Sequence, residues 1–359
     1  MQGENLTFYH ELGSLRFAPF AVSDILRRAQ GDALAALGLG SIECHYEVVA
    51  SGSHWRLRDY GDYLSAPTLL IVAAPIKRPY IWDLAPSVSA IRRCLRGRLH
   101  LYLLEWLPPS NHSGNNGLDE YVQAIMEGIA TVSSTSRGLK PFLAGHSLGG
   151  TLAAIFGAVA PTSIQGLVLL GAPLCFQPKQ SQFRDALISI VPSEVSDTDP
   201  FPGSLLSHMS AMASPVTFIW SRQINALASL TDHHTLEIHA RVERWALDEV
   251  ALPGKLVHQI IDWLYRENRF YRGTLIVNGE QVSPSSLLTP TLAVVNMADD
   301  VAPPATVRPF ADAMEPDKAR VIEYPGEVGV SLQHLGILIG RKAHAHVWPQ
   351  IMSWLNGAC

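Results

Sequence analysis

The 359-residue sequence predicts an α/β fold, in which helices cover both faces of a mostly parallel sheet. Three observations lead to this prediction. Short, continuous apolar runs recur along the chain, as expected of strands that are buried on both sides. Segments with helical spacing separate these runs. Apolar residues make up 47% of the chain and charged residues only 16%, which is ample material for one large core.

The predicted elements alternate along the chain. After a helical lead-in over residues 1–40, an antiparallel hairpin is expected over 44–58, with its turn at Ser51-Gly52. The runs predicted to be buried strands occupy 68–74, 99–104, 141–145, 165–170, 290–295 and 319–324. The segments predicted to be helices occupy 86–96, 118–132, 148–159, 304–314 and 343–356. Because strands and helices alternate, right-handed β–α–β units in a mostly parallel sheet are expected.

One long interval interrupts this alternation. Residues 175–285 have helical spacing and are rich in Trp, Met and Phe, whereas connections in such folds usually take only a few residues. We therefore expect a core formed by residues 41–174 and 286–359, with a mostly helical cap (lid) inserted at 175–285. Such a cap is expected to face the functional site and to exclude water from it.

The most specific local signal is the run Gly145-His146-Ser147-Leu148-Gly149, which matches G-x-S-x-G. It lies between a predicted strand and a predicted Ala-rich helix, which is the context that this motif requires. At such a turn the serine adopts a strained conformation and projects from the carboxyl edge of the sheet, while the flanking glycines permit a close approach. The pattern predicts an α/β-hydrolase fold with Ser147 as the nucleophile. His146 should point away from the reaction.

A serine hydroxyl needs a general base, and the base needs an acid that orients it. In this fold the chain order is Ser, then Asp or Glu, then His. Asp299 and Asp300 both follow the penultimate predicted strand, and they compete for the role of the acid. His334 lies in the loop after the last predicted strand and is the expected base. His344 and His346 fall within the last predicted helix, where we expect them on the surface.

An oxyanion hole requires two backbone N–H donors. One should come from Leu148, the residue after the nucleophile, and the other from the loop after the first central strand. Because Pro75 has no N–H, Ile76 is the expected second donor. Lys77 and Arg78 come next in the chain; they either attract an anionic arm of the substrate or are merely solvated.

Composition excludes several classes of function. The net charge of −5 and the pI of about 6.3 do not favour binding to nucleic acid or to an anionic membrane. The N-terminus lacks a signal-peptide pattern, and no apolar run approaches the ~18–20 residues of a membrane span. The four cysteines match neither a CxxC metal site nor a disulfide framework. We expect a cytoplasmic protein that uses no cofactor and no metal.

Several segments resemble the polyhydroxyalkanoate (poly-3-hydroxybutyrate) synthase family of the α/β-hydrolase superfamily. Residues 67–83 end in Arg-Pro-Tyr-Ile-Trp-Asp, which is similar to that family's R-P-Y-I-x-D stretch beside the oxyanion loop. Further similar landmarks are E-W-L-P-P at 105–109, G-L-D-E-Y at 117–121, and two cap segments at 242–245 and 264–273. The resemblance covers roughly residues 65–355.

This resemblance implies both a site and a substrate. In the family the acid lies four residues before the first proline of a D-x-x-x-P run, which selects Asp299, with Pro303, over Asp300. The family's base corresponds to His334. The implied substrate is a 3-hydroxyacyl group, as a coenzyme A thioester or a polyester. The implied partners are a helper subunit, a second copy of the chain in a homodimer, or the surface of a polyester granule.

Three residues depart from the family's pattern. Ser147 stands where the synthases have cysteine, Asp300 where they usually have histidine, and Gln333 where they have glycine. A thiolate exchanges readily with thioesters and suits repeated chain transfer, whereas serine is the usual nucleophile of esterases and lipases. We therefore expect a serine hydrolase or acyltransferase. The alternatives are a polymerase that uses Ser147 and a non-catalytic relative that binds granules or partners.

Overall fold

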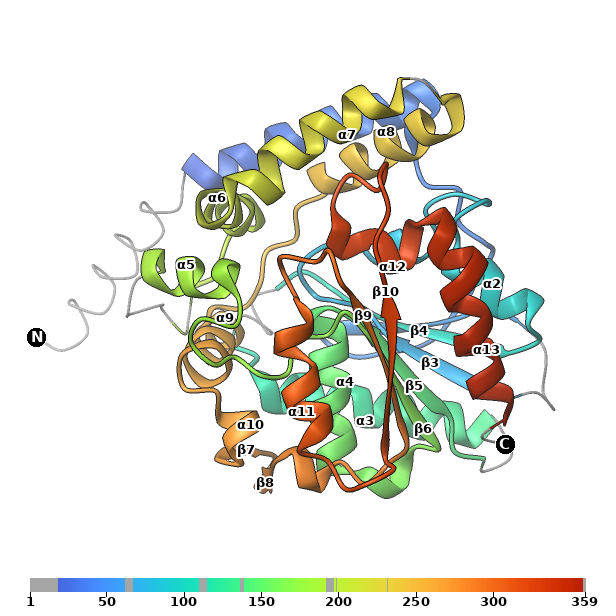
Figure 1. The fold of residues 1–359 in the computed structure, drawn as a ribbon, viewed down its shortest axis with the longest axis vertical. Coiled ribbons are helices and arrows are strands. Elements are labelled where there is room, and N and C mark those ends of the chain that lie inside the picture. Colours follow the sequence, from blue (N-terminus) through green and yellow to red (C-terminus); the bar gives the residue numbers. More distant parts are fainter. Residues whose placement is uncertain are drawn as a thin grey trace, which may run out of the picture.

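The computed structural model of the protein describes residues 19–61, 67–109, 115–135, 139–191, 197, 199–230 and 232–357. Within these residues the chain folds around an eight-stranded sheet of order β1-β2-β4-β3-β5-β6-β9-β10 (Figure 1). Its strands are β1 (Glu47–Ser51), β2 (Trp55–Asp59), β3 (Thr68–Val72), β4 (His100–Trp106), β5 (Phe142–His146), β6 (Gly166–Leu170), β9 (Thr291–Asn296) and β10 (Ala319–Tyr324). β2 is antiparallel to both of its neighbours, and the pairs from β4 to β10 are parallel.

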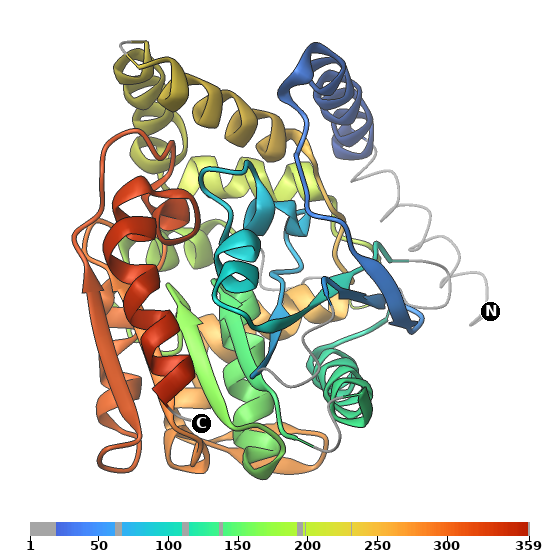
Figure 2. The ribbon, with the colours of Figure 1, turned by 90° about the vertical axis from the view of Figure 1, so that its right-hand side faces the viewer.

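Helices cover both faces of this sheet (Figures 1 and 2). One face carries α2 (Ala90–Arg96), α12 (Gly336–Ile339) and α13 (Trp348–Gly357), and the other carries α3 (Leu118–Thr135), α4 (Leu148–Val159) and α11 (Arg308–Asp312). Because both faces are covered, β3, β4, β5, β6 and β9 are buried along their whole length. The predicted α/β-hydrolase architecture, with its mostly parallel sheet, is confirmed.

The elements of the core lie within a few residues of their predicted positions. The hairpin expected over 44–58 is formed by β1 and β2, and α4 has the predicted bounds. The helix expected over 304–314 is instead a short turn at Pro304–Thr306 followed by α11. Proline has no N–H to donate and is favoured at the start of a helix, so the prolines of this segment begin separate turns.

One expectation about the last helix is wrong. His346 is exposed, but His344 is half-buried and stacks on the ring of Trp348, with ring centroids 5.8 Å apart. Its Nε2 donates to the Leu338 carbonyl at 2.7 Å, and burial lowers its pKa. The helix turns this side chain toward the end of α12, which a pattern of residues along one helix does not reveal.

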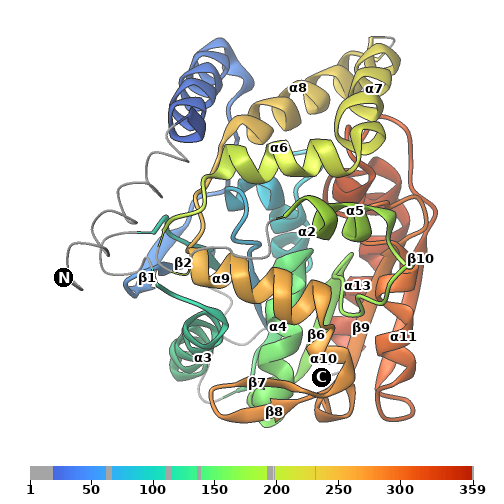
Figure 3. The same ribbon diagram turned by 90° about the vertical axis from the view of Figure 1, so that its left-hand side faces the viewer.

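The N-terminal segment packs on the chain far from it in sequence. Residues 19–34 form a helix, whereas residues 1–18 of the predicted lead-in lie outside the described residues. In all three views this helix lies beside α6 (Gly203–Ala213) and α8 (His233–Leu247) (Figures 1, 2 and 3). Asp24 accepts a hydrogen bond of 2.8 Å from the Ser204 N–H, and Arg27 pairs with Glu249 at 2.9 Å. These contacts fix the helix above the sheet.

The segment between β6 and β9 has two parts, which lie near opposite ends of the sheet. Helices α5 (Gln182–Ile190), α6, α7 (Ser221–Ser229), α8 and α9 (Gly254–Gln259) lie beyond or beside the carboxyl ends of the parallel strands (Figure 3). By contrast, α10 (Arg269–Arg272) and a hairpin of β7 (Leu275–Val277) and β8 (Glu280–Val282) lie near the opposite end of the sheet, where β7 and β8 pack against α3 and α4. No helix in the described part of the chain has the length and hydrophobicity to cross a bilayer.

Candidate active site

Ser147 occupies the sharp turn between β5 and α4. Its backbone has φ 56° and ψ −134°, a region that non-glycine residues rarely adopt. The glycines around it are required by space. A Cβ on Gly145 would lie 2.5 Å from the Gly150 nitrogen, and one on Gly149 would lie 2.4 Å from the Val72 carbonyl oxygen. Because these glycines have no Cβ, the first turn of α4 can pack directly against the ends of β5 and β3.

Asp299 and His334 are brought together from loops after β9 and β10. His334 Nδ1 donates a hydrogen bond of 2.7 Å to Asp299 Oδ2, and both side chains are buried. The other carboxylate oxygen of Asp299 accepts from the N–H groups of Val301 and Ala302, at 2.8 and 3.1 Å. Burial acts to raise the pKa of Asp299, but the imidazole of His334 and these hydrogen bonds outweigh it and lower the pKa. Asp299 is therefore ionised at neutral pH.

The second ring nitrogen of His334 is available for chemistry. Its Nε2 is buried and has no hydrogen-bond partner among the described residues. His334 and Ser147 line the same cavity, together with Leu148 and Ile76. A neutral imidazole that donates from Nδ1 presents a lone pair at Nε2, which is the form that a general base requires.

The loop that carries His334 is held by two side chains from the sheet. His146 Nε2 donates to the His334 carbonyl at 2.8 Å, and Asn296 Nδ2 donates to the Gln333 carbonyl at 2.7 Å. Burial lowers the pKa of His146 to about 3, so its ring stays neutral. The G-x-S-x-G pattern does not specify this role for His146, because it depends on a loop 188 residues away in sequence.

The residues that depart from the synthase pattern also have defined contacts. Asp300 is exposed, and it accepts a hydrogen bond of 3.0 Å from Thr217 Oγ1, in the segment between α6 and α7. Gln333 turns back on its own loop, where its Nε2 donates to the Glu327 carbonyl at 2.7 Å. Asp300 thus faces the inserted segment, and Gln333 stabilises the loop that precedes His334.

Lys77 was expected either to attract an anionic arm of the substrate or to be solvated, and the structure shows neither. Its ammonium is largely buried and pairs with Glu249 Oε2 at 2.7 Å, so it is neither solvated nor placed for a substrate anion. Arg78 is partly exposed and lies 4.0 Å from Glu105 Oε1. Glu249, the partner of Lys77, lies two residues after the end of α8. No pattern in the sequence pairs it with the loop after β3.

A cavity of about 490 Å³ opens at Ser147. Its walls are mostly apolar, and many of them come from the segment between β6 and β9, including Phe183, Leu187, Leu206, Phe218, Val242, Leu252, Val257 and Ile261. The N-terminal helix contributes Phe20, Ser23 and Arg27, which sequence analysis did not identify as site residues. A mostly apolar cavity that contains a few polar side chains, Ser147 and His334 among them, suits a largely apolar ligand.

The chain is similar to several known proteins. A family model described as "Serine aminopeptidase, S33" matches residues 109–214, which include Ser147. Among curated proteins, the chain is 27% identical over 316 residues to the poly(3-hydroxyalkanoate) polymerase subunit PhaC of Haloarcula marismortui, covering 87% of this chain and 64% of that protein. It is 25% identical over 290 residues to the subunit of the same name from Allochromatium vinosum, covering 80% of each.

The chain therefore resembles the poly(3-hydroxyalkanoate) polymerases, although it spans less than two thirds of the Haloarcula relative. Among solved structures, it is similar to a monoacylglycerol lipase from Paleococcus ferrophilus, with a TM-score of 0.53, 17% identity, and coverage of 85% of this chain and 99% of that one. A thermophilic esterase from Thermogutta terrifontis gives a TM-score of 0.50 at 14% identity, covering 88% and 99%. The structural matches support the α/β-hydrolase fold, and the relatives indicate an enzyme.

Proposed function

We propose that this chain is a serine acyl-transfer enzyme that forms an acyl-enzyme on Ser147. The observation that carries the proposal is the buried hydrogen bond between His334 and Asp299. The Nε2 of His334, which has no partner among the residues that the structure describes, lies in the cavity that Ser147 lines. A nucleophile, a base and an orienting acid are the minimum for this chemistry, and no cofactor takes part in it.

In the proposed reaction, Ser147 Oγ attacks an ester or thioester carbonyl while His334 Nε2 takes its proton. The N–H groups of Leu148 and Ile76 stabilise the oxyanion of the tetrahedral intermediate. When the intermediate collapses, His334 returns the proton to the departing alkoxide or thiolate. A second hydroxyl, of water or an alcohol, then attacks the acyl-enzyme while His334 takes its proton. When this second tetrahedral intermediate collapses, His334 returns the proton to Ser147 Oγ and the acyl product is released. Asp299 stabilises the charged imidazole in both halves.

The proposed substrate is a 3-hydroxyacyl ester or thioester. Two observations support it: the similarity to poly(3-hydroxyalkanoate) polymerases and the apolar cavity at Ser147. We propose that the helices between β6 and β9 act as a cap that covers this substrate, since they supply much of the cavity wall. In the form of the proposal that we prefer, the acceptor in the second step is water or the hydroxyl group of one small acceptor molecule.

A second candidate is a polymerase that uses Ser147 and passes the acyl group to a growing chain. The names of the curated relatives favour it. Both candidates use the same residues and differ only in the acceptor. Incubation of the pure protein with 3-hydroxybutyryl coenzyme A separates them, because hydrolysis releases free acid and polymerisation accumulates polyester.

Labelling with a serine-directed alkyl phosphonate tests the nucleophile. We expect one phosphonate per chain in the wild type and none in Ser147→Ala, with the adduct on the peptide that contains Ser147. Undiminished labelling of Ser147→Ala would reject the assignment. A wild type that is neither labelled nor active on any ester or thioester would favour the non-catalytic alternative.

A further inference from the structure

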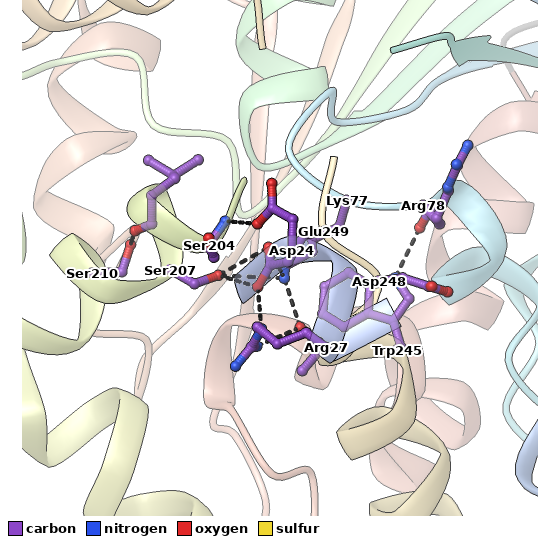
Figure 4. A network of polar contacts seen from close by, with 12 residues as sticks. Asp24, Arg27, Lys77, Arg78, Ser204, Ser207, Ser210, Trp245, Asp248 and Glu249 are labelled. Atoms are coloured by element: carbon purple, nitrogen blue, oxygen red, sulfur yellow. Dashed lines mark hydrogen bonds and ion pairs between the residues drawn. The ribbon is translucent and has the colours of Figure 1, made fainter. Parts of the chain in front are cut away.

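The loop after β3 is tied to the end of α8 through one carboxylate (Figure 4). Lys77 Nζ donates to Glu249 Oε2 and to the Ala246 carbonyl, at 2.7 Å each, and to Ser207 Oγ at 3.3 Å. Arg27 Nε, on the N-terminal helix, donates to Glu249 Oε1 at 2.9 Å. The Glu249 carboxylate therefore links the loop, α6 and the N-terminal helix.

Within this network, the charges of Lys77 and Glu249 are buried. The side chain of Glu249 is 1% exposed and that of Lys77 is 14% exposed. Buried ions are tolerated only when they are paired and hydrogen-bonded, so each partner fixes the position of the other. An ammonium has three N–H donors, and all three of Lys77 are engaged within the protein. None remains to bind a substrate anion.

The main chain reinforces this contact. Lys77 and Glu249 face each other as an antiparallel bridge. Three residues further on, Leu252 exchanges two N–H···O hydrogen bonds, of 2.7 and 3.0 Å, with Phe201. Residues 249–252 are thus fixed on one side to the loop after β3 and on the other to the residues that precede α6.

Two more contacts follow along the same loop. Trp245 Nε1 donates to the Arg78 carbonyl at 2.8 Å, and Tyr80 OH donates to Asp248 Oδ2 at 2.6 Å. The residues after Ile76 are therefore attached repeatedly to the end of α8, as Figure 4 shows for Lys77 and Arg78.

Ile76 is also restrained from its other side. The end of β3 lies so close to α4 that a Cβ on Gly149 would be 2.4 Å from the Val72 carbonyl oxygen. Only a few residues separate Val72 from Lys77, so the position of Ile76 is set by the contact with α4 and by the pairing with Glu249.

We propose that Lys77 and Glu249 are positioning residues for the oxyanion hole, and that their buried pair fixes the Ile76 N–H relative to that of Leu148. This inference rests on the proposed function, because Ile76 matters only if Ser147 forms a tetrahedral intermediate. It makes the geometry of the reaction depend on α6, the end of α8 and the N-terminal helix, none of which carries a proposed catalytic group.

The test compares binding of the transition state with binding of the ground state. Glu249→Gln keeps the shape of the side chain but removes its charge, and Lys77→Met removes the other charge. For both variants kcat on p-nitrophenyl butyrate should fall about 10- to 100-fold at nearly constant KM. The reason is that displacing the Ile76 N–H by about 1 Å weakens its hydrogen bond to the oxyanion in the transition state by a factor of that order. The Ki of an alkyl trifluoromethyl ketone, whose serine adduct carries the oxyanion, should rise by the same factor. The Kd of the corresponding alcohol should not change.

Lys255→Met is the matched control. Lys255 lies on α9 and pairs with Glu120 at 3.2 Å, away from the loop after β3. Its loss should leave kcat and the Ki of the ketone unchanged. For every variant, phosphonate labelling counts the competent Ser147 sites, and kcat is expressed per labelled site.

Two results would overturn the inference. If activity falls only in proportion to the labelled sites, with normal kcat and Ki per site, the pair merely stabilises the fold. If the Ki of the ketone and the Kd of the alcohol rise equally, the pair shapes the whole cavity rather than the oxyanion hole. A wild type that is not labelled at Ser147 would instead contradict the proposed function on which the inference rests.

Discussion

Asp299 and Asp300 are adjacent in sequence but lie in opposite environments. Asp299 is buried, bonded to His334 and supported by two backbone N–H groups, whereas Asp300 is exposed and bonded to Thr217. A carboxylate can orient an imidazole only from within hydrogen-bond reach, so only Asp299 has the geometry for the proposed role of the acid.

Asp299→Asn should therefore reduce kcat/KM on p-nitrophenyl butyrate by about 10³- to 10⁴-fold, because the imidazole loses both its tautomer and its orientation. Asp300→Asn serves as the matched control and should change kcat/KM by less than about tenfold. Circular dichroism should show both variants folded. If Asp300→Asn lowers kcat/KM more than Asp299→Asn does, the acid has been assigned to the wrong residue.

His146 connects the elbow to the loop of the proposed base. Its pKa in the folded protein, about 3, lies below the ordinary value of 6.5 that applies when the chain is unfolded. Above pH 6.5 its ring is neutral in both states. As the pH falls below 6.5, the unfolded chain takes up a proton that the folded chain does not, so folding becomes less favourable.

We accordingly predict that acidification from pH 6.5 toward pH 4 lowers the free energy of unfolding by up to about 1.4 kcal/mol per pH unit through His146. His146→Gln keeps a donor for the His334 carbonyl but cannot titrate, so its stability should fall less steeply over this range. Urea unfolding of both proteins between pH 4 and pH 8 measures the two slopes. If the free energies of unfolding of the two proteins fell in parallel with pH, the pKa of His146 would be the same in the folded and unfolded chains.

The buried ion pair of Lys77 could not be predicted from the sequence. The chain order of the fold was enough to propose Ser147 and His334 without knowledge of distances. Lys77, by contrast, has its partner 172 residues away in Glu249, and no periodicity or motif connects the two. Only the folded chain shows that the residue after Ile76 is a buried ion.

At the level of elements, strands and helices differ in how far the sequence determined them. Buried parallel strands have continuous apolar runs, which made β3, β5, β6 and β9 predictable. The β7–β8 hairpin was missed although its turn, Asn278-Gly279, is a strong hairpin signal and both residues have positive φ, 49° and 81°. Its strands have only three residues each and lie within a long segment with helical spacing, so the helical pattern outweighed the turn.

The helices between β6 and β9 have a hydrophobic cluster of their own. It includes Phe183, Leu187, Phe201, Met209, Leu252, Val257 and Ile261. Several of these side chains also line the cavity at Ser147. We infer that the packing of this cluster sets the space for the acyl chain, whereas other residues of the segment, such as Val242 and Leu256, belong to the core cluster of the sheet.

Phe183→Ala should therefore enlarge the cavity and raise the ratio of kcat/KM for p-nitrophenyl octanoate over the butyrate about 3- to 30-fold, since a few methylene groups gain apolar space. Met212→Ala, an exposed change on α6, is the control and should leave the ratio unchanged. An equal change in kcat/KM for both esters in Phe183→Ala would mean that this side chain does not limit acyl length.

For the whole molecule, the site is an assembly of distant segments at one edge of the sheet. Parallel strands bring their carboxyl ends together, so residues after β5, β9 and β10 converge once the fold is known, and the sequence predicted that convergence. The contribution of the N-terminal helix was not predictable. Phe20, Ser23 and Arg27 reach the cavity only because that helix packs on α6 and α8, a tertiary contact with no local signature.

The choice of acceptor is also a property of the whole molecule, because it depends on how the proposed cap admits water. If the protein is a hydrolase, it should turn over p-nitrophenyl butyrate steadily, and Ser147→Cys should lose most of that rate. A polymerase should instead give a burst of acylation with slow release, and Ser147→Cys should keep or gain activity on 3-hydroxybutyryl coenzyme A. A cysteine variant that makes polyester, beside a wild type that hydrolyses nothing, would contradict our preference for hydrolysis or single transfer.

If the acyl group passes through Ser147, the protein must carry it there during turnover, and the mass of the acylated protein shows whether it does. The wild type is mixed with excess p-nitrophenyl butyrate, quenched in acid within milliseconds to seconds, and digested for peptide mass spectrometry. We expect one butyryl group on the peptide that contains Ser147, no adduct in Ser147→Ala, and slow accumulation of the adduct in His334→Ala. Continued turnover with no adduct, or a butyryl group on another residue that persists in Ser147→Ala, would contradict it.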